Sequence, residues 1–116
     1  FRVVVTDGYR RRCAITGEKT LPALDAAHIR PYSEGGTHTP SNGILFRRDI
    51  HSLFDAGYVT VGPDLRFEVS ARIRQEFENG RHYYELHGKE LSSPALPYQR
   101  PDTAALEWHN TTIYKG

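Results

Sequence analysis

The sequence predicts an α+β fold built around one short β-hairpin and the helix that follows it. Two compact apolar runs, at residues 23–29 and 43–46, flank a segment rich in glycine, proline and serine, which favours two strands joined by a loop. The next segment places Ile50, Leu53 and Phe54 at helical spacing, and Gly57 is positioned to end that helix. The length of 116 residues suits one domain with one modest core.

The remaining segments predict elements that flank this hairpin and helix. Asp64 lies in the turn of a second hairpin that has one buried face, and Ser70 caps a helix whose Ile73 and Phe77 face inward. In a last helix, Leu106 and either Trp108 or His109 pack back on the core. The expected elements are a strand and turn at 13–17, hairpin strands at 58–61 and 65–69, a helix at 70–79, a short extended pair at 83–86 and 88–91, an irregular connection at 94–101 and a helix at 103–114.

Composition excludes several classes of protein. The sequence has no apolar run of eighteen residues and no basic-then-apolar leader, so neither a membrane span nor a signal peptide is indicated. The single cysteine, Cys13, excludes an internal disulfide and a four-cysteine zinc site, and we expect it to pack in the core. Because the chain starts with Phe1 and contains no methionine, we expect it to be the C-terminal part of a longer protein.

Basic residues are concentrated in the first half of the chain. The formal net charge is only +1, yet residues 1–50 hold eight Lys or Arg against five acidic residues, and residues 51–116 hold seven against nine. Arg30, Arg47, Arg48 and the run at 10–12 could contact phosphates, or could be ordinary solvated surface. Arg30 and Arg48 are the better candidates because the loop and the helix start place them near the residues described next.

Residues 25–55 contain three side chains with proton or metal chemistry: His28, Asn42 and His51. Taken singly, each has an ordinary explanation. A histidine at a strand end is usually a polar surface residue, an Asn before Gly is usually a turn former, and a helical histidine beside Ile50 is usually half-buried packing. Taken together, the predicted strand, loop, strand and helix bring both histidines to one concave corner.

The order and flanks of these residues resemble those of the HNH endonucleases of the ββα-metal superfamily. Ala-His-Ile-Arg-Pro surrounds His28, Ser-Asn-Gly-Ile-Leu surrounds Asn42, and Arg-Arg-Asp-Ile-His-Ser-Leu-Phe-Asp surrounds His51. The resemblance implies a ββα-metal core at about residues 23–56 within a single nuclease domain, residues 1–116, with an additional hairpin and flanking helices. It also favours a helix leading to Gly8, where residues 1–9 alone could equally be a strand.

The resemblance assigns a role to each residue. His28 would be the base that deprotonates water, a task that suits an imidazole with an ordinary pKa of about 6.5. His51 would be a ligand of one divalent cation, Mg²⁺ or Mn²⁺, with Ni²⁺, Co²⁺ or Zn²⁺ as alternatives. Asn42 would tie the loop through amide hydrogen bonds and so fix how the base points.

The sequence departs from the family pattern at Ala27, where many relatives carry a metal ligand. Asp25 lies two residues earlier, on the same face of a regular strand, and is our candidate for the carboxylate ligand. His38 is the reserve candidate, and Asp25 could also be a hydrogen-bonded structural residue. Asp55, one helical turn beyond His51, could orient that imidazole or be simply solvated, and we favour the solvated role.

The resemblance implies a metal-dependent DNA endonuclease that hydrolyses phosphodiester bonds. Bacterial domains with these phrases are often the C-terminal nuclease of modification-dependent restriction enzymes, so we expect an N-terminal recognition domain in the same polypeptide and a cytoplasmic location. Cleavage of both strands would need two sites, which suggests a homodimer. Two alternatives remain: a noncatalytic DNA-binding or interaction module, which Ala27 favours, and a nonspecific toxin nuclease with the same chemistry.

Overall fold

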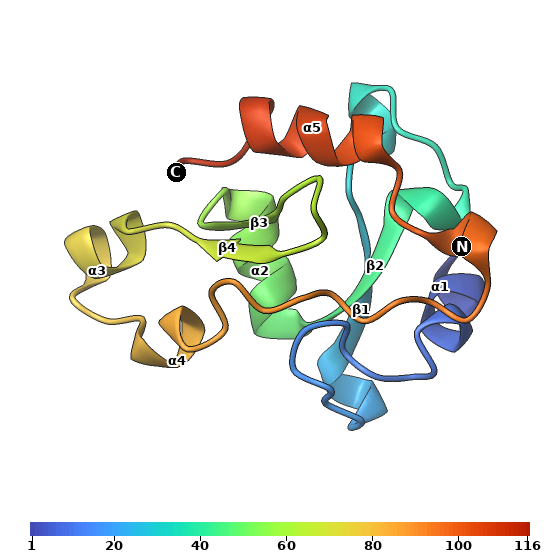
Figure 1. The fold of residues 1–116 in the computed structure, drawn as a ribbon, viewed down its shortest axis with the longest axis horizontal. Coiled ribbons are helices and arrows are strands. Elements are labelled where there is room, and N and C mark those ends of the chain that lie inside the picture. The colour runs from blue at the N-terminus through green and yellow to red at the C-terminus, as the bar shows by residue number, and fades with distance from the viewer.

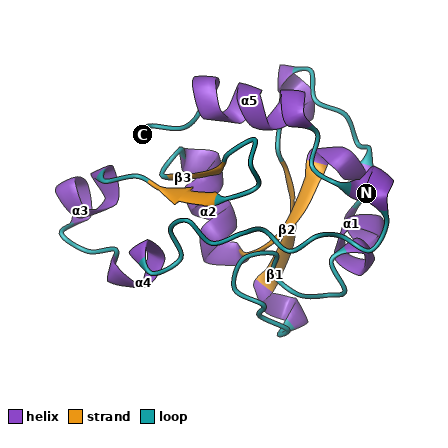
Figure 2. Cartoon of the chain, in the orientation of Figure 1, coloured by secondary structure: helices purple, strands orange, loops and turns teal.

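The computed structural model describes all residues, 1–116, and alternates helices with short antiparallel strands (Figure 1). Strand β1 pairs with β2, and β3 pairs with β4, so the chain forms two separate two-stranded sheets (Figure 2). In chain order the helices and strands are α1 (Arg2–Gly8), β1 (Leu24–His28), β2 (Gly43–Arg47), α2 (Arg48–Ala56), β3 (Val59–Val61), β4 (Phe67–Val69), α3 (Arg72–Phe77), α4 (Arg81–Tyr84) and α5 (Thr103–Thr112). This mixture of helices and strands confirms the predicted α+β class.

The hairpin of β1 and β2 forms as predicted. Asp25 lies opposite Phe46, and His28 lies opposite Gly43 at the loop end of the hairpin. A Cβ on Gly43 would come within 2.6 Å of Val5, so glycine at this position lets α1 pack directly against the strand. The hairpin therefore carries His28 where the loop begins.

The loop between the two strands folds back sharply after Arg30. The backbone N–H of Gly36 donates to the carbonyl oxygen of Pro31 at 2.9 Å. A Cβ on Gly36 would lie 1.8 Å from the carbonyl oxygen of Arg30, an approach that only glycine permits. The Gly35-Gly36 pair, which the sequence marks as a turn, thus closes the base of this loop.

Helix α2 begins directly after β2 and folds back against the hairpin (Figure 1). Ile50 and Phe54 are fully buried, whereas Leu53, also expected to face inward, is only half-buried. Gly57 ends the helix in the left-handed region, with φ of +86°. The predicted helix and its glycine stop are therefore confirmed.

Helix α5 covers α2 and β3 from the C-terminal end of the chain. Asp102 caps it by accepting a hydrogen bond from the N–H of Ala105 at 3.1 Å. Of the two residues that could pack inward, His109 is buried and Trp108 is half-buried. A single cluster of buried hydrophobic residues joins these helices to the hairpins, and Cys13 lies within it.

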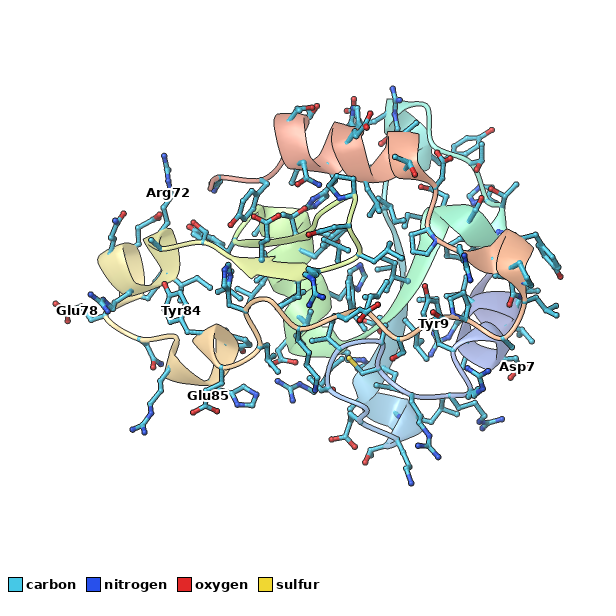
Figure 3. The ribbon with its side chains drawn as sticks, viewed as in Figure 1. Asp7, Tyr9, Arg72, Glu78, Tyr84 and Glu85 are labelled. Atoms are coloured by element: carbon cyan, nitrogen blue, oxygen red, sulfur yellow. The ribbon has the colours of Figure 1, made fainter.

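Two predictions of local structure were wrong. Residues 13–17 form a turn rather than a strand, because the N–H of Gly17 donates back to the carbonyl oxygen of Cys13 at 3.0 Å. Residues 83–91 do not form an extended pair; Arg81–Tyr84 is helix α4, and only Glu90 makes a strand-like bridge, to Arg66. The hydroxyl of Tyr84, labelled between α3 and α4 in Figure 3, donates to the carbonyl oxygen of Ser70, a tertiary contact that favours the helix.

Two predictions about burial also failed. The second hairpin was expected to bury one face, yet Val59, Thr60 and Val61 are all buried, because α5 covers the other side of β3. Phe77 was expected inside but is 59% exposed and meets only the edge of the Tyr58 ring. Ile73 is therefore the only buried residue of α3. No helix is both long and apolar enough to cross a bilayer.

Candidate active site

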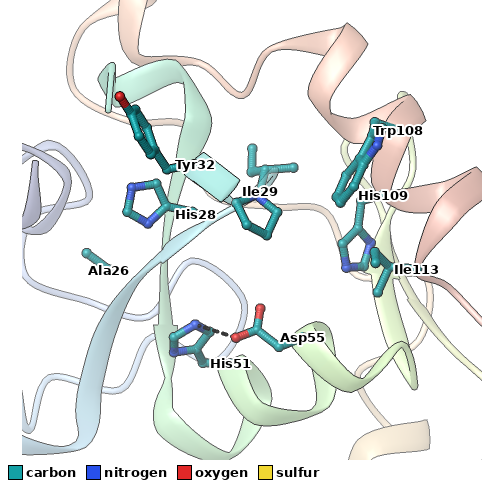
Figure 4. Close-up of a pocket in the computed structure, with 10 residues that line it drawn as sticks. Ala26, His28, Ile29, Tyr32, His51, Asp55, Trp108, His109 and Ile113 are labelled. Atoms are coloured by element: carbon teal, nitrogen blue, oxygen red, sulfur yellow. Dashed lines mark ion pairs between the residues drawn. The ribbon is translucent and has the colours of Figure 1, made fainter. Parts of the chain in front are cut away.

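A pocket of about 440 Å³ opens between the hairpin, α2 and α5. Figure 4 shows His28 and Tyr32 on one side of it, His51 and Asp55 one turn apart on α2, and Trp108 on the opposite wall. The two histidines, 23 positions apart in the numbering, thus face the same space. The complete lining consists of Ala26, His28, Ile29, Pro31, Tyr32, His51, Asp55, Trp108, His109 and Ile113.

His28 sits at the last position of β1 with its imidazole half-buried. Burial lowers the pKa of His28, and the nearby His38 and His51 lower it further, while Asp55 acts weakly in the other direction. Its Nε2 lies 3.1 Å from Nδ1 of His38, within hydrogen-bond distance. The environment therefore favours the neutral imidazole, which is the form that can accept a proton.

Asn42 joins the two ends of the loop that follows His28. Its Oδ1 accepts from the N–H of Arg30 at 3.0 Å, and its Nδ2 donates to the carbonyl oxygens of Arg30 and Thr37, each at 2.8 Å. The side chain is buried, with 4% of the residue exposed. All three bonds go to backbone, so Asn42 acts on the path of the loop and has no bond to His51 or Asp25.

His51 lies between two carboxylates. Its Nδ1 is 3.0 Å from Oδ2 of Asp25, and its Nε2 is 3.1 Å from Oδ2 of Asp55. The hydrogen bond to Asp55 is the largest cause that raises the pKa of His51 to about 9; burial opposes it, and the hydrogen bond to Asp25 adds to the rise. The expectation that Asp55 is only solvated was therefore wrong, although its side chain is 59% exposed.

The position that departs from the family pattern, Ala27, is buried in the core with 1% exposed. The Asp25 side chain instead points toward α2, where its Oδ1 lies 3.3 Å from Nε of Arg48. The reserve candidate, His38, lies beside His28 and is not among the partners of Asp25 or His51. Asp25 is thus the carboxylate on β1 that reaches the His51 imidazole.

The donor atoms at this corner are a carboxylate pair and one imidazole. No group of three or more His, Cys, Asp and Glu side chains is arranged as a complete metal site. Asp25 and His51 nevertheless adjoin each other, and carboxylate and imidazole donors suit divalent ions that keep other positions for water or phosphate. A neutral His51 that donates Nε2–H to Asp55 would present the lone pair of Nδ1 beside Asp25.

The three arginines predicted near the site differ in how free they are. Arg47 makes two bonds to Asp49, at 2.6 and 2.9 Å, and its side chain is only 21% exposed, which suits a structural ion pair. The Arg30 guanidinium lies 5.2 Å from the centre of the Trp108 ring and donates to the carbonyl oxygen of Glu34. Arg48 is 62% exposed beside Asp25 and is the freest of the three.

Sequence reasoning missed two parts of the site. The pairing of His38 with His28 depends on the path of an exposed loop, and the histidine itself was the only signal. The wall formed by Trp108, His109 and Ile113 comes from α5, more than fifty positions after His51, with no motif to mark it. Asp55 could be found from its spacing of four from His51, which places both on one helix face.

One segment of the chain matches a known protein family. Residues 13–62 match the model of a family described as HNH endonuclease. This segment of the chain is similar to HNH endonucleases. The matched segment contains His28, Asn42 and His51, and the enzyme class that the match indicates is a nuclease.

The fold beyond the HNH core also has a solved counterpart. The chain is similar to the structure of the modification-dependent TagI restriction endonuclease, with 23% identity and a TM-score of 0.63. The similarity covers 94% of this chain and 35% of that protein, so the chain spans about a third of its length. No curated protein matches the chain.

Proposed function

We propose that this chain is the cleavage domain of a metal-dependent DNA endonuclease of the restriction type, directed at modified DNA. The observation that carries the proposal is that His28 and His51 line one pocket. One imidazole is favoured in its neutral form, and the other lies beside a carboxylate. A base and a cation ligand on facing walls are what hydrolysis of a phosphodiester requires.

His28 takes the proton from the attacking water. Because burial and neighbouring imidazoles lower its pKa, the ring is neutral at physiological pH and can act as a general base. The protonated ring then returns its proton to bulk solvent, for which the open pocket gives a path. Asn42 holds the loop that begins directly after the base.

Asp25 and His51 would hold the divalent cation, with Asp55 fixing the orientation of the His51 ring. When bound, a Mg²⁺ or Mn²⁺ ion, with Ni²⁺, Co²⁺ or Zn²⁺ as alternatives, offsets the negative charge on the phosphate and on the leaving 3′ oxygen. Arg48, beside Asp25, would contact the same strand of DNA, and Arg30 would contact it only if released from Trp108.

The wider assignment rests on the likeness to a modification-dependent restriction endonuclease, of which this chain spans about a third. We infer that a recognition domain in the same polypeptide chooses the target and that this domain supplies the cut. A homodimer would place one site on each strand. Such an enzyme would act in the bacterial cytoplasm, where the DNA is.

The competing function is a noncatalytic DNA-binding or interaction module. The observation that favours it is the double pairing of His51, whose two nitrogens are both occupied by carboxylates. If those pairs are permanent, no cation is held and the domain serves only for contact. Metal binding therefore separates the two functions.

The test combines calorimetry with a plasmid-nicking assay in Mn²⁺. We expect wild type to bind one Mn²⁺ per chain and to nick DNA, His51→Ala to lose both properties, and His28→Ala to bind Mn²⁺ but cut at least ~10²-fold more slowly. Gln75→Ala, which alters an exposed side chain on α3, is the control and should behave as wild type. Equal Mn²⁺ binding by wild type and His51→Ala, or equal nicking by wild type and His28→Ala, would contradict the proposal.

A further inference from the structure

Four aromatic rings form a cluster at the loop end of the hairpin. The Phe1 ring stacks on His28, with ring centres 3.9 Å apart and planes 4° apart. The Tyr32 ring stacks on His38 in the same way, at 4.7 Å and 8°. The two imidazoles meet edge-on, with planes 73° apart, where Nε2 of His28 faces Nδ1 of His38 at 3.1 Å.

The hydrogen bond between these imidazoles can be made in two ways. Either Nε2–H of His28 donates to Nδ1 of His38, or Nδ1–H of His38 donates to Nε2 of His28. In the first arrangement the remaining lone pair of His28 is on Nδ1, which has no hydrogen-bond partner within the chain. In the second, a neutral His28 carries its proton on Nδ1 and its lone pair is consumed by His38. Only the first arrangement leaves His28 able to accept a proton from water.

Both rings are fixed in orientation by contacts outside the pair. Stacking on Phe1 and Tyr32 sets the two ring planes, so neither imidazole can turn its edge away without losing a stacked neighbour. The segment that carries His38 is anchored at the adjacent residue, because Asn42 donates to the carbonyl oxygen of Thr37. His38 is exposed, yet it is held at a defined place.

We propose that His38 is a positioning residue for the base: it accepts the hydrogen bond from Nε2–H of His28 and so keeps the reactive lone pair on Nδ1. Phe1 and Tyr32 act as side walls that hold the two rings edge to edge. This inference rests on the proposed function, in which His28 is the base, and it gives the exposed loop a part in the reaction.

The first test reads the hydrogen bond directly by ¹⁵N NMR of the histidine side chains in wild-type protein. We expect a ¹⁵N–¹⁵N coupling across the hydrogen bond between Nε2 of His28 and Nδ1 of His38, with the proton bonded to Nε2 of His28. The coupling should vanish in His38→Phe. Absence of the coupling in wild type, or a proton bonded to Nδ1 of His38, would overturn the inference.

The second test uses two complementary substitutions in a cleavage assay. His38→Phe keeps a ring to stack on Tyr32 but removes the acceptor, whereas His38→Asn loses the ring but keeps an acceptor oxygen near the place of Nδ1. We expect His38→Phe to lower kcat about ten-fold, less than the ~10²–10⁴-fold that general base catalysis contributes, with little change in KM for DNA. His38→Asn should retain most of the wild-type kcat.

The two variants separate hydrogen bonding from packing. If His38→Asn loses as much activity as His38→Phe, or if His38→Phe keeps full activity, the positioning role is wrong. A wild-type protein that shows the coupling but cuts no DNA would overturn the proposed function and, with it, this role. A wild-type protein that cleaves DNA but shows no coupling between His28 and His38 would overturn this inference alone.

Discussion

At the scale of single residues, the geometry of the site depends on side chains that bond to backbone. Asn42 closes a loop of twelve positions between itself and Arg30 with one amide group. His28, Asn42 and His51 could be selected from the sequence because their order and flanks occur together. His38, the hydrogen-bond partner of His28, could not be selected in this way. It lies in an exposed loop rich in glycine, serine and threonine, and such a loop has no periodicity from which to place a side chain.

Replacing Asn42 with Ala should destabilise the protein. The substitution leaves the N–H of Arg30 and the carbonyl oxygens of Arg30 and Thr37 without their partner, which costs about 1–3 kcal/mol per buried group that water cannot reach. Urea denaturation followed by circular dichroism measures the change. Ser41→Ala, at the neighbouring position, is the control and should stay within about 0.5 kcal/mol of wild type. An unchanged urea midpoint for Asn42→Ala would show that these bonds do not support the fold.

Stability of the metal-free protein should fall as the pH rises from 6.5 to 9. The pKa of His51 is raised from 6.5 to about 9 in the folded state, mainly by Asp55 and then by Asp25. A raised pKa contributes stability that is fully present below the unfolded pKa and is lost as pH rises through the folded one. Thermal unfolding in a chelator at several pH values measures this loss. His51→Asn should flatten the curve over this range, and an identical pH dependence in both proteins would refute the assignment.

At the scale of elements, one buried histidine of α5, His109, connects that helix to α2. The His109 ring stacks on Phe54 at 3.6 Å, its Nε2 donates to the carbonyl oxygen of Phe54 at 2.8 Å, and its Nδ1 accepts from the hydroxyl of Thr60 at 2.7 Å. The sequence left Trp108 and His109 as equal candidates for the inward face. A buried histidine is acceptable only when both nitrogens find partners, and those partners lie on α2 and β3, far away in the sequence.

The contact of His109 predicts a loss of stability in acid. Burial lowers the pKa of His109 from its ordinary 6.5, so the unfolded chain takes up this proton more readily than the folded one. Stability should therefore decline as the pH falls below about 6.5. Urea midpoints at pH 7.5 and 5.0 measure the decline, which should be smaller in His109→Leu, although that variant starts less stable at neutral pH. Gln75→Leu, an exposed control on α3, should decline as wild type does. An equally steep decline in His109→Leu would contradict the prediction.

At the scale of the whole molecule, charge is distributed so that one exposed arginine stands beside the candidate site. The net charge of +1 gives little general attraction to DNA. Arg47 is already paired with Asp49, and Arg30 is packed on Trp108. Arg48 is the residue from which a contact to DNA phosphate is most readily made.

Replacing Arg48 with Ala should weaken DNA binding in a salt-dependent way. Loss of one phosphate contact should reduce the slope of log K against log salt by about 0.9. Fluorescence anisotropy with a short duplex, in Ca²⁺ to prevent cutting, gives the affinity at several salt concentrations. Arg81→Ala removes the same charge from α4, where the side chain is 95% exposed, and should leave the slope unchanged. Equal slopes for the two variants would show that Arg48 contributes only to net charge.

The path of the chain was predictable where local signals agreed with tertiary packing. The hairpin, α2 and its stop at Gly57, and the cap of α5 at Asp102 followed from spacing, turn residues and capping. The structure of residues 83–91 was not predictable from local signals. The hydroxyl of Tyr84 donates to the carbonyl oxygen of Ser70, fourteen positions away, and this contact favours α4 over the extended structure that the Tyr and Leu residues indicate. The burial of both faces of β3 likewise depends on α5, which no local pattern reveals.

The contact of His109 with Phe54 determines which residues a chimeric protein would need in order to keep this nuclease fold. The segment that matches the family, residues 13–62, ends before the helix that shelters Phe54 and β3. A chimera carrying only that segment would expose the Phe54 ring to water and would leave α2 without the helix that packs against it. A chimera therefore has to include the C-terminal residues through Lys115, whose N–H donates to the carbonyl oxygen of Gly57 at the end of α2.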